Sequence, residues 1–397
     1  MIKVILRNVI NIFVWLLGKI SNFFVVNIGL HKQKRLLIIR IDGIGDIVLF
    51  EPALKYIKTL YKSYEIVILV RSNYESLLSN HPKINKVISL NYQKYKRNIF
   101  YKLFFLIKIA NEKFEIILYP TYSRERIGDE IVLWSNASEK IGWNTQSLSM
   151  TPKENNRGNK IYTNLIKSNF SIYEHELKRN KEFLAHLGIE VRDFSPINYY
   201  GEKEEAKIEQ LIEKFGINKN QIIVIIPGAL KQYRQWAAFN WKNLMSEIIK
   251  ITESPKFLIV GSKNDENIIQ IDDKQFLNNY IINLCGKLAL NELPPLFKKS
   301  TFVIGNETGP MHIAIASGVK TIAILGGGHF SCFMPYGNKV KNKFIYKKMD
   351  CFQCDWQCIY PEKRCVTEIT TKEVFDEVKK LLISKNHYID KDKISIK

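Results

Sequence analysis

The chain has 397 residues, enough for about two or three domains with a substantial core, and this length excludes small disulfide-stabilised scaffolds. Its 46% hydrophobic, 12% aromatic and 25% charged residues are ordinary globular usage and exclude collagenous and disordered chains. Lys and Arg outnumber Asp and Glu by 59 to 39, and the resulting charge of +20 suits an anionic partner: nucleic acid, a membrane surface or a phosphorylated substrate.

Residues 1–33 predict an amphipathic helix followed by a linker. Large apolar side chains dominate 2–30, but the longest uncharged stretches, 8–18 and 20–30, are shorter than the ~20 residues of a bilayer span. At a helical period the polar residues fall on one stripe, opposite a bulky apolar face. Such a helix suits the lipid headgroup plane, with its cations over anionic lipid. The alternatives are a helix that packs on the rest of the chain or on another subunit, and a helix that spans the membrane.

From residue 34 onward, short apolar stretches alternate with helical ones. Buried strands are predicted first at 36–41, 65–70, 86–90 and 115–119 and then at 221–226, 257–260, 280–284, 301–304 and 321–325. Helices are expected at about 46–61, 98–110 and 170–187, the last within a polar, less regular region. This alternation predicts an α/β fold of two doubly wound, Rossmann-like parallel sheets facing a cleft.

The expected division follows from these patterns. The amphipathic helix and its linker occupy 1–33, an N-terminal domain 34–200, a C-terminal domain 218–345, and a cysteine-rich segment with a final helix 346–397, with the two domains joined near 200–218. A basic cluster lies in the N-terminal domain, at Lys94, Lys96, Arg97, Lys102 and Lys108. A solvated basic face explains this cluster as well as an anionic partner does.

The first predicted strand leads into Gly43-Ile44-Gly45-Asp46. Gly43 and Gly45 permit a tight strand-to-helix turn and close approach of a ligand to the backbone. Val48 stands where a dinucleotide fingerprint needs its third glycine, which disfavours a nicotinamide cofactor. Asp46, at the helix start, is either an N-cap carboxylate or a base that takes the proton of an acceptor hydroxyl, and one residue can do both.

A turn after the strand at 221–226 suits an anionic ligand. Gly228 lies in a Pro-Gly-Ala turn whose free N–H groups would face the cleft. Lys231 and Arg234 follow and can bind phosphate oxygens.

A second such turn follows the strand at 301–304. The N–H groups of Thr308 and Gly309 would point at an anion along the helix dipole, and Pro310 suits the first helical turn. Glu307 would repel a phosphate, so we expect it to bind sugar hydroxyls. His312, one turn into the helix, is either a packed histidine or a ligand contact.

Four of the six cysteines fall within fifteen residues as C-x2-C-x3-C-x6-C: Cys351, Cys354, Cys358 and Cys365. Disulfides are disfavoured in a strand-helix protein without an export signal, and four thiolates can hold zinc or iron tetrahedrally. Such a metal would be structural, because no position stays open for substrate. Reduced thiols and disulfides are the alternatives. Cys285 and Cys332 look like ordinary buried or loop cysteines.

Together these segments resemble glycosyltransferase family 9, the bacterial ADP-heptose heptosyltransferases, over about 350 residues. Residues 36–56 are similar to the family's strand, glycine-Asp turn and helix, 227–236 to its P-G-A…K-x-W segment, and 305–316 to its N-D-T-G-P-M-H segment. The resemblance implies a GT-B fold, an ADP-heptose donor held by the C-terminal domain, an acceptor on the N-terminal domain, and Asp46 as the catalytic base.

The resemblance also implies inversion at the anomeric carbon without a catalytic metal. Lys231, Arg234 and the Thr308-Gly309 turn would stabilise the leaving diphosphate. Arg234 stands where the family commonly has Lys, and Glu307 where it commonly has Asp, which leaves the identity of the sugar open. The cysteine segment is similar to the iron-binding finger of protein-modifying heptosyltransferases.

We therefore expect a transferase on the cytoplasmic face of the inner membrane that moves a heptose, or a related sugar, to a lipopolysaccharide core or other surface glycan. Its acceptor would be anionic and lipid-linked. Transfer to a protein, as in autotransporter heptosylation, is the alternative, and a non-catalytic sugar-binding protein on the same fold is the second. Nucleic acid is the least favoured partner, because no helix-turn-helix, ribonucleoprotein or zinc-finger pattern occurs. The sequence leaves the oligomeric state open.

Overall fold

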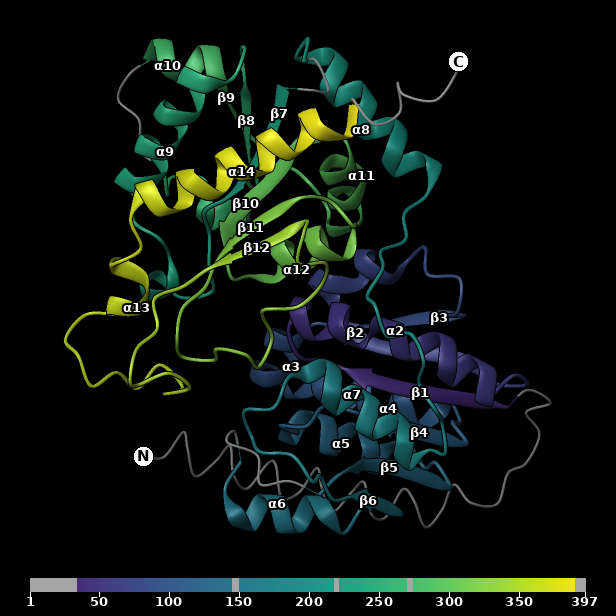
Figure 1. Cartoon of the computed structure of the whole chain (residues 1–397). Helices are drawn as coiled ribbons and strands as arrows, with labels where there is room; N and C mark the ends of the chain where they lie inside the picture. Colours follow the sequence, from purple (N-terminus) through teal and green to yellow (C-terminus); the bar gives the residue numbers. More distant parts are fainter. Residues whose placement is uncertain (1–33, 145–149, 218–220, 270–273, 390–397) are drawn as a thin grey trace, which may run out of the picture. The chain divides into compact units, whose positions relative to one another are not determined.

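The computed structural model describes residues 34–144, 150–217, 221–269 and 274–389 (Figure 1). The predicted N-terminal amphipathic helix lies outside the described residues. The chain divides into two compact units. Unit 1 comprises Met1–Ile172 and Leu177–Phe194, and unit 2 comprises Tyr173–Glu176 and Ser195–Lys397.

Unit 1 contains a six-stranded parallel sheet in the order β3-β2-β1-β4-β5-β6. Its strands are β1 (Arg35–Arg40), β2 (Glu65–Arg71), β3 (Lys86–Leu90), β4 (Ile116–Tyr119), β5 (Glu139–Trp143) and β6 (Asn164–Ile166). The helices are α2 (Ile44–Leu60), η1 (Ser72–Leu78), α3 (Tyr92–Arg97), α4 (Ile99–Asn111), α5 (Arg126–Trp134), α6 (Pro152–Asn159) and α7 (Glu176–His186). The aliphatic β1 and β2 are buried on both faces, as the inner strands of a parallel sheet must be.

Unit 2 repeats this plan with the order β12-β11-β10-β7-β8-β9. Its strands are β7 (Ile222–Ile226), β8 (Lys256–Ile259), β9 (Ile281–Asn283), β10 (Phe302–Asn306), β11 (Thr321–Ile324) and β12 (Asn342–Ile345). The helices are α8 (Glu202–Lys214), η3 (Gln232–Arg234), α9 (Ala238–Ile251), η4 (Lys263–Asp265), α10 (Lys274–Tyr280), η5 (Leu290–Glu292), α11 (Leu293–Lys298), α12 (Gly309–Ala316), α13 (Arg364–Thr367) and α14 (Thr371–Ile389).

The two sheets share one topology, and it places the candidate sites. In each unit the first strand lies between the second and the fourth, so the order in which successive strands are added to the sheet reverses between β1 and β4 and again between β7 and β10, although all strands are parallel. Ligands of doubly wound folds bind outside the carboxyl ends of the strands at such a switch point. The turns at 43–46, 227–234 and 306–309 all follow strands at these two places.

Two parts of the expected division differ from the structure. The two domains were expected to be joined near 200–218, but most of these residues form α8, which belongs to unit 2 and makes ion pairs there, Lys299 with Glu209 and Glu205. The C-terminal helix is not a separate segment either. Its residues Val374 and Val378 lie in the hydrophobic core of unit 2, because α14 packs against α9.

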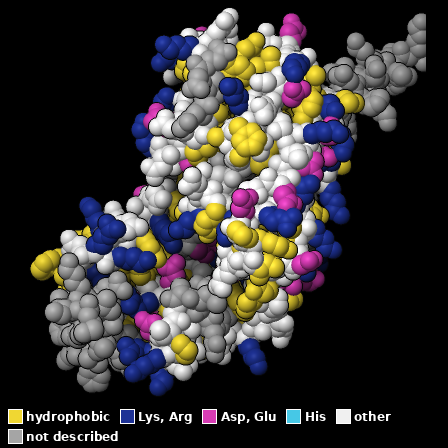
Figure 2. Space-filling model, turned by 90° about the vertical axis from the view of Figure 1, so that its left-hand side faces the viewer, with side chains coloured by type: hydrophobic (Ala, Val, Ile, Leu, Met, Phe, Trp, Pro, Cys, Tyr) yellow, Lys and Arg dark blue, Asp and Glu magenta, His cyan; other side chains and the backbone are white. Residues whose placement is uncertain are grey.

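Basic, acidic and hydrophobic side chains are interspersed on the face drawn in Figure 2. Among the residues that the structure describes, no helix has the length and apolar character required to cross a bilayer.

Candidate active site

Asp46 lies in the first turn of α2, in unit 1. Gly43 is the N-cap residue, and its N–H donates to Asp46 Oδ2 at 2.9 Å. A Cβ at Gly43 would come within 2.8 Å of that oxygen, so glycine lets the carboxylate fold back, while Gly45 follows within the first turn. The expected N-cap position of Asp46 is thus wrong by three residues: the carboxylate stabilises the helix start from the third helical position.

Arg40, at the end of β1, stabilises the turn that carries Asp46. It is completely buried, and its Nη2 donates to the Asp46 carbonyl oxygen at 2.8 Å and pairs with Asp42 Oδ2 at 3.0 Å. Thr121, in the loop after β4, donates its hydroxyl to the same Asp42 oxygen at 2.8 Å. These contacts fix two loops on either side of the switch point.

The other carboxylate oxygen of Asp42 indicates a place where a ligand could donate a hydrogen bond. Asp42 Oδ1 is buried and has no hydrogen-bond partner among the residues that the structure describes. Leaving a buried carboxylate oxygen unpaired costs free energy unless a ligand or water donates to it. A charged residue at the end of the aliphatic β1, with an Asp two residues later, was the sequence signal for this network, and the sequence analysis missed it.

In unit 2, Asn306 joins the loops after β7 and β10. Its buried side chain donates to the Pro227 carbonyl at 2.6 Å and accepts the Trp236 backbone N–H at 3.1 Å. The Trp236 indole donates to the Ile369 carbonyl at 2.7 Å. The loop that carries Lys231 and Arg234 is therefore anchored at both ends.

Gly228 lies in this anchored loop, and glycine is required there because the backbone passes close to a carboxylate. A Cβ at Gly228 would come within 2.5 Å of Asp265, whose Oδ2 accepts from the backbone and hydroxyl of Ser262 at 2.7 Å each. Asp265 is a further residue that the sequence analysis did not single out. Lys231 is exposed, unlike the partly buried Arg234.

Glu307 and Arg234 come together as a buried pair. Arg234 Nη2 lies 3.9 Å from Glu307 Oε2, and the Glu307 side chain is almost fully buried. Burial raises the pKa of Glu307 to about 7, although Arg234 and a hydrogen bond from the Gly326 backbone act in the other direction. Within the described chain, Arg234 Nε and Glu307 Oε2 have no hydrogen-bond partner. The pair thus offers a donor and an acceptor to a polar ligand.

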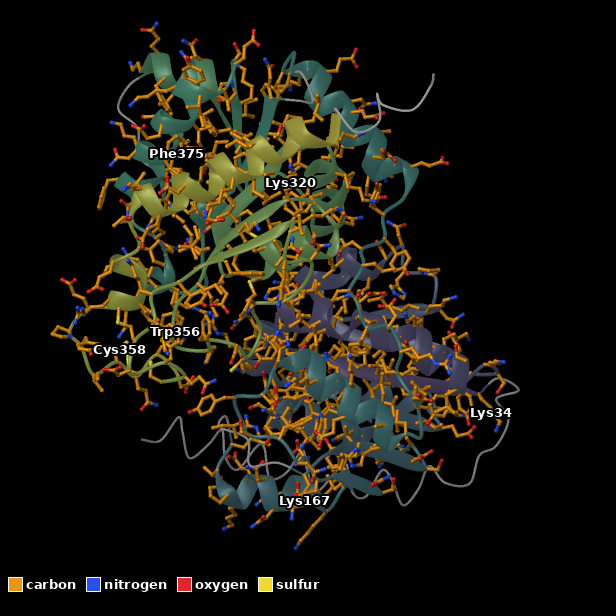
Figure 3. All side chains as sticks on the ribbon, viewed as in Figure 1. Lys34, Lys167, Lys320, Trp356, Cys358 and Phe375 are labelled. Atoms are coloured by element: carbon orange, nitrogen blue, oxygen red, sulfur yellow. The ribbon has the colours of Figure 1, made fainter. Side chains whose placement is uncertain are left out.

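Trp356, which the sequence analysis missed, completes this group. Its ring lies 4.7 Å from the Arg234 guanidinium, and a Cβ at Gly326 or Gly328 would strike the indole at 2.2 and 2.4 Å. The indole Nε1 is buried without a partner in the described part of the chain, and the backbone φ of +61° is unfavourable for an aromatic residue. Figure 3 marks Trp356 near Cys358 in the segment that precedes α13. The loop glycines were its sequence signal, since they make room for a large side chain. We call Arg234, Glu307 and Trp356 the unit 2 cluster.

The start of α12 lies next to Glu307. Thr308 is the N-cap in extended conformation, and its carbonyl accepts the N–H groups of Met311 and His312. The Gly309 N–H is outside this helical ladder and is available to an anion. His312 is buried, and its Nδ1 lies 3.0 Å from the Tyr336 hydroxyl. Burial lowers the pKa of His312 to about 3, which favours the packed alternative with a neutral ring.

The four clustered cysteines are free thiols that interact with one another. Burial raises the pKa of Cys354 and of Cys365, and Cys351 and Cys358 add to both shifts. In the described residues, no three His, Cys, Asp or Glu side chains are arranged to hold a metal ion. The segment instead packs on the loop after β11, where Gln353 and Asp355 donate backbone N–H groups to Gly327 and Gly328. As expected, Cys285 and Cys332 are buried outside this segment.

The titration of Glu307 predicts a pH-dependent stability. Its ordinary pKa is 4.5 and its folded pKa about 7, so between these values the folded chain binds a proton that the unfolded chain loses. The Glu307 contribution is therefore present below pH ~4.5 and is lost as the pH rises through ~7. Relative to Glu307→Gln, the wild-type free energy of unfolding should fall by roughly 3 kcal/mol between about pH 5 and 8, measured by denaturant unfolding. A difference that stays constant with pH would contradict the burial of this carboxyl.

Comparison with known proteins begins with a family match. The description "Glycosyltransferase family 9 (heptosyltransferase)" matches residues 131–359. Lipooligosaccharide heptosyltransferase 2 of Campylobacter jejuni is 27% identical over 169 residues, which cover 41% of this chain and about half, 52%, of that protein. Lipopolysaccharide heptosyltransferase 1 of Campylobacter coli is 25% identical over 307 residues, 74% of this chain and 84% of that protein.

Solved structures share the fold. A family 9 glycosyl transferase from Veillonella parvula has a TM-score of 0.71 at 16% identity, with 88% of this chain and 97% of that chain covered. The E. coli ADP-heptose lipopolysaccharide heptosyltransferase II has a TM-score of 0.66 at 15% identity, covering 89% and 99%. E. coli heptosyltransferase WaaC with ADP-2-deoxy-2-fluoro heptose has a TM-score of 0.60 at 15% identity, covering 87% and 99%. The chain thus has the α/β, GT-B-like fold of these structures, with two parallel six-stranded sheets.

Proposed function

Because the chain belongs to glycosyltransferase family 9 (heptosyltransferase), we propose that it transfers a heptose from ADP-heptose, or a related sugar from the corresponding nucleotide-diphosphate sugar, to a lipopolysaccharide core or other cell-surface glycan. The observation that carries the proposal is the fixed carboxylate of Asp46 at the β1/β4 switch point. The Gly43 N–H donates to this carboxylate and Arg40 donates to the backbone carbonyl of the same residue, in a fold whose second sheet bears the donor-type turns. Curated relatives named as lipopolysaccharide and lipooligosaccharide heptosyltransferases support the choice of acceptor.

In the proposed reaction, Asp46 acts as the base. The acceptor hydroxyl attacks the anomeric carbon and passes its proton to the Asp46 carboxylate. The new bond between sugar and acceptor oxygen forms as the bond to the diphosphate breaks on the opposite face, so the configuration inverts. The bond electrons leave with ADP. Asp42, with its unpaired buried oxygen, is suited to accept a hydrogen bond from a second acceptor hydroxyl.

The donor would bind to unit 2. Arg234, the exposed Lys231 and the Gly309 N–H are the groups suited to the departing diphosphate, whose negative charge grows in the transition state. Glu307 would accept hydrogen bonds from sugar hydroxyls, and Trp356 would keep the Arg234 guanidinium in place by stacking. No catalytic metal is part of this proposal.

A nucleotide screen tests the donor. Purified protein should melt several degrees higher with ADP or ADP-heptose than alone, because a ligand that binds only the folded state stabilises it. UDP, GDP and CDP at equal concentration serve as controls. A shift with UDP and none with ADP would contradict the ADP-heptose assignment but leave a nucleotide-sugar transferase in place.

A protein acceptor is the second candidate. The cysteine segment favours it, because its sequence is similar to the iron-binding finger of protein-modifying heptosyltransferases. The structure of E. coli TibC, named an iron-containing dodecameric glycosyltransferase, shares the fold with a TM-score of 0.53 at 13% identity. The two candidates differ in the molecule that gains the sugar. Presenting purified enzyme and donor with a heptose-deficient lipopolysaccharide and with an unmodified protein acceptor distinguishes them.

We keep a structural zinc or iron ion at Cys351, Cys354, Cys358 and Cys365 as a proposal of its own. The mutual influence of the four thiols supports it, while their present arrangement would have to tighten around an ion. Purified protein should then contain about one metal ion per chain, and Cys354→Ser together with Cys358→Ser should lose it. Metal-free protein with four reactive thiols would exclude the site.

Membrane association is also proposed rather than observed. Residues 1–33, which contain four cations and no acid, support a monotopic contact on the cytoplasmic face of the inner membrane. Removing residues 1–33 should lower binding to anionic vesicles. Equal binding of the shortened chain would remove this segment from the account.

A further inference from the structure

Helix α4 leaves an apolar stripe on the surface of unit 1. Phe100 is 81% exposed, Phe104 70% and Ile107 50%. Their spacing of four and then three residues puts them on one side of the helix. The opposite side packs into the core through Phe105, Leu106 and Ile109. Single exposed apolar residues are common, but neighbouring phenylalanines on one stripe mark an interaction surface.

Cations accompany this stripe. Lys94, Lys96 and Arg97 on α3, and Lys108 on α4, are exposed. Between Glu75 and Glu112 the chain has seven Lys or Arg and no Asp or Glu. Lys102, which the sequence analysis put in the same cluster, does not belong to the surface: it is buried and lies 2.8 Å from Glu130. The charge of Lys102 is paired in the interior of unit 1. The cations available to an outside partner are therefore the exposed ones on α3 and α4.

The surface begins at the sheet edge that also carries Asp46. Helix α3 follows the carboxyl end of β3, and β3 is two strands from β1, about 10 Å at the usual strand spacing. Arg71, at the end of β2, bridges this distance: it donates to the Ile41 carbonyl and lies 4.0 Å from the Tyr92 ring. Lys96 lies 4.4 Å from the same ring.

We propose that this surface, formed by Phe100, Phe104, Ile107 and the exposed cations of α3 and α4, docks on an anionic lipid bilayer. The aromatic side chains would enter the headgroup region, and the cations would lie over lipid phosphates. This contact is additional to that of residues 1–33. It rests in part on the proposed function, because a membrane-bound acceptor would then be presented at the Asp46 edge of unit 1.

Charge selects lipid over the other occupants. A second copy would bring the same acid-free, cationic surface to this one and be repelled. Residues 1–33 are likewise basic and contain no acid, so they offer no complementary charge. An anionic bilayer satisfies both the apolar stripe and the cations.

Vesicle flotation of the full chain tests the proposal. We expect binding to phosphatidylcholine vesicles that contain phosphatidylglycerol, weaker binding without it, and loss at high salt. Phe100→Ser with Phe104→Ser should weaken binding at least about tenfold, since two apolar insertions are lost. Phe239→Ser, at a residue 66% exposed on α9 of unit 2, is the matched control and should bind like wild type. Both sets of variants should keep the wild-type melting temperature.

The outcomes separate the occupants. Wild-type flotation by the double Phe variant would overturn the proposal, as would a change from dimer to monomer in sedimentation, which would identify a second copy. The two Phe substitutions are also introduced into a chain that lacks residues 1–33. If both contacts bind lipid, this chain should bind vesicles more weakly than a chain with either change alone. Vesicle binding needs no sugar transfer, and ADP binding by the double variant should be unchanged, so failure here is distinct from failure of the proposed function.

Discussion

Replacing Asp46 by Asn should lower kcat for sugar transfer by about 10²–10⁴-fold, the usual contribution of a general base. An amide cannot take the acceptor proton. Its oxygen can still accept the Gly43 N–H, so the start of α2 and the affinity for ADP should be retained. The measurement is steady-state transfer with donor and acceptor varied in turn, alongside the melting temperature of each variant.

Glu204→Gln is a matched control for this experiment. Glu204 holds the same third position in α8, where it accepts the N–H of the N-cap Gly201 at 2.8 Å. Its change should leave kcat unaltered, because it contacts the start of α8 and Asn291 of η5, neither of which belongs to the candidate site. Wild-type turnover by the Asp46→Asn variant would show that this carboxylate only caps a helix.

Replacing Arg234 by Gln should reduce kcat by about 10²-fold or more, the effect of losing one group that stabilises developing charge. Arg234→Lys should recover part of the rate, because it keeps the charge but not the planar hydrogen-bonding group. Trp356→Leu removes the stacked face and should mainly raise the KM for the donor, since Arg234 would stay charged but be less well held. Kinetics with ADP-heptose varied distinguish these effects.

The control for the Arg234 series is Arg364→Gln. Arg364 also stacks on an aromatic ring, that of Tyr360 at 4.9 Å, but it is exposed and pairs with Glu368. Its loss should leave both kcat and KM near wild type. Equal kinetics for Arg234→Gln and wild type would exclude Arg234 from leaving-group stabilisation.

The inner strands were predictable because each is a continuous aliphatic stretch, as in Ile222–Ile226 of β7. The edge strand β6 and its neighbour β5 were not predicted. Asn164–Ile166 has three residues, and Glu139–Trp143 contains two charged residues and a glycine, so neither carries a clear strand pattern. Helix α8 was missed as well, although its sequence favours a helix: Glu202–Lys214 is rich in good helix formers, has acids in its first turn, and buries Ile208 and Ile212 at a spacing of four.

The turns of the candidate site could be read from Gly, Pro and Asp at strand ends, because those residues have local conformational reasons to be there. Trp356 and Arg40 were missed, because the sequence signals beside them do not reveal the distant groups that they contact. Trp356 reaches Arg234 from more than a hundred residues away, and the role of Arg40 depends on a loop after β4. The same limit explains why Lys102 was wrongly placed in the basic surface cluster. Its partner Glu130 lies on the next helix, and the two form a buried ion pair.

The most direct test of the account is transfer from ADP-heptose to a heptose-deficient lipopolysaccharide by the purified full chain. The account predicts that the acceptor gains heptose with inverted anomeric configuration, that ADP appears in equal amount, and that the Asp46→Asn variant produces neither above background. An acceptor that stays unmodified while ADP-heptose neither binds nor is consumed would contradict it, as would equal turnover by wild type and Asp46→Asn.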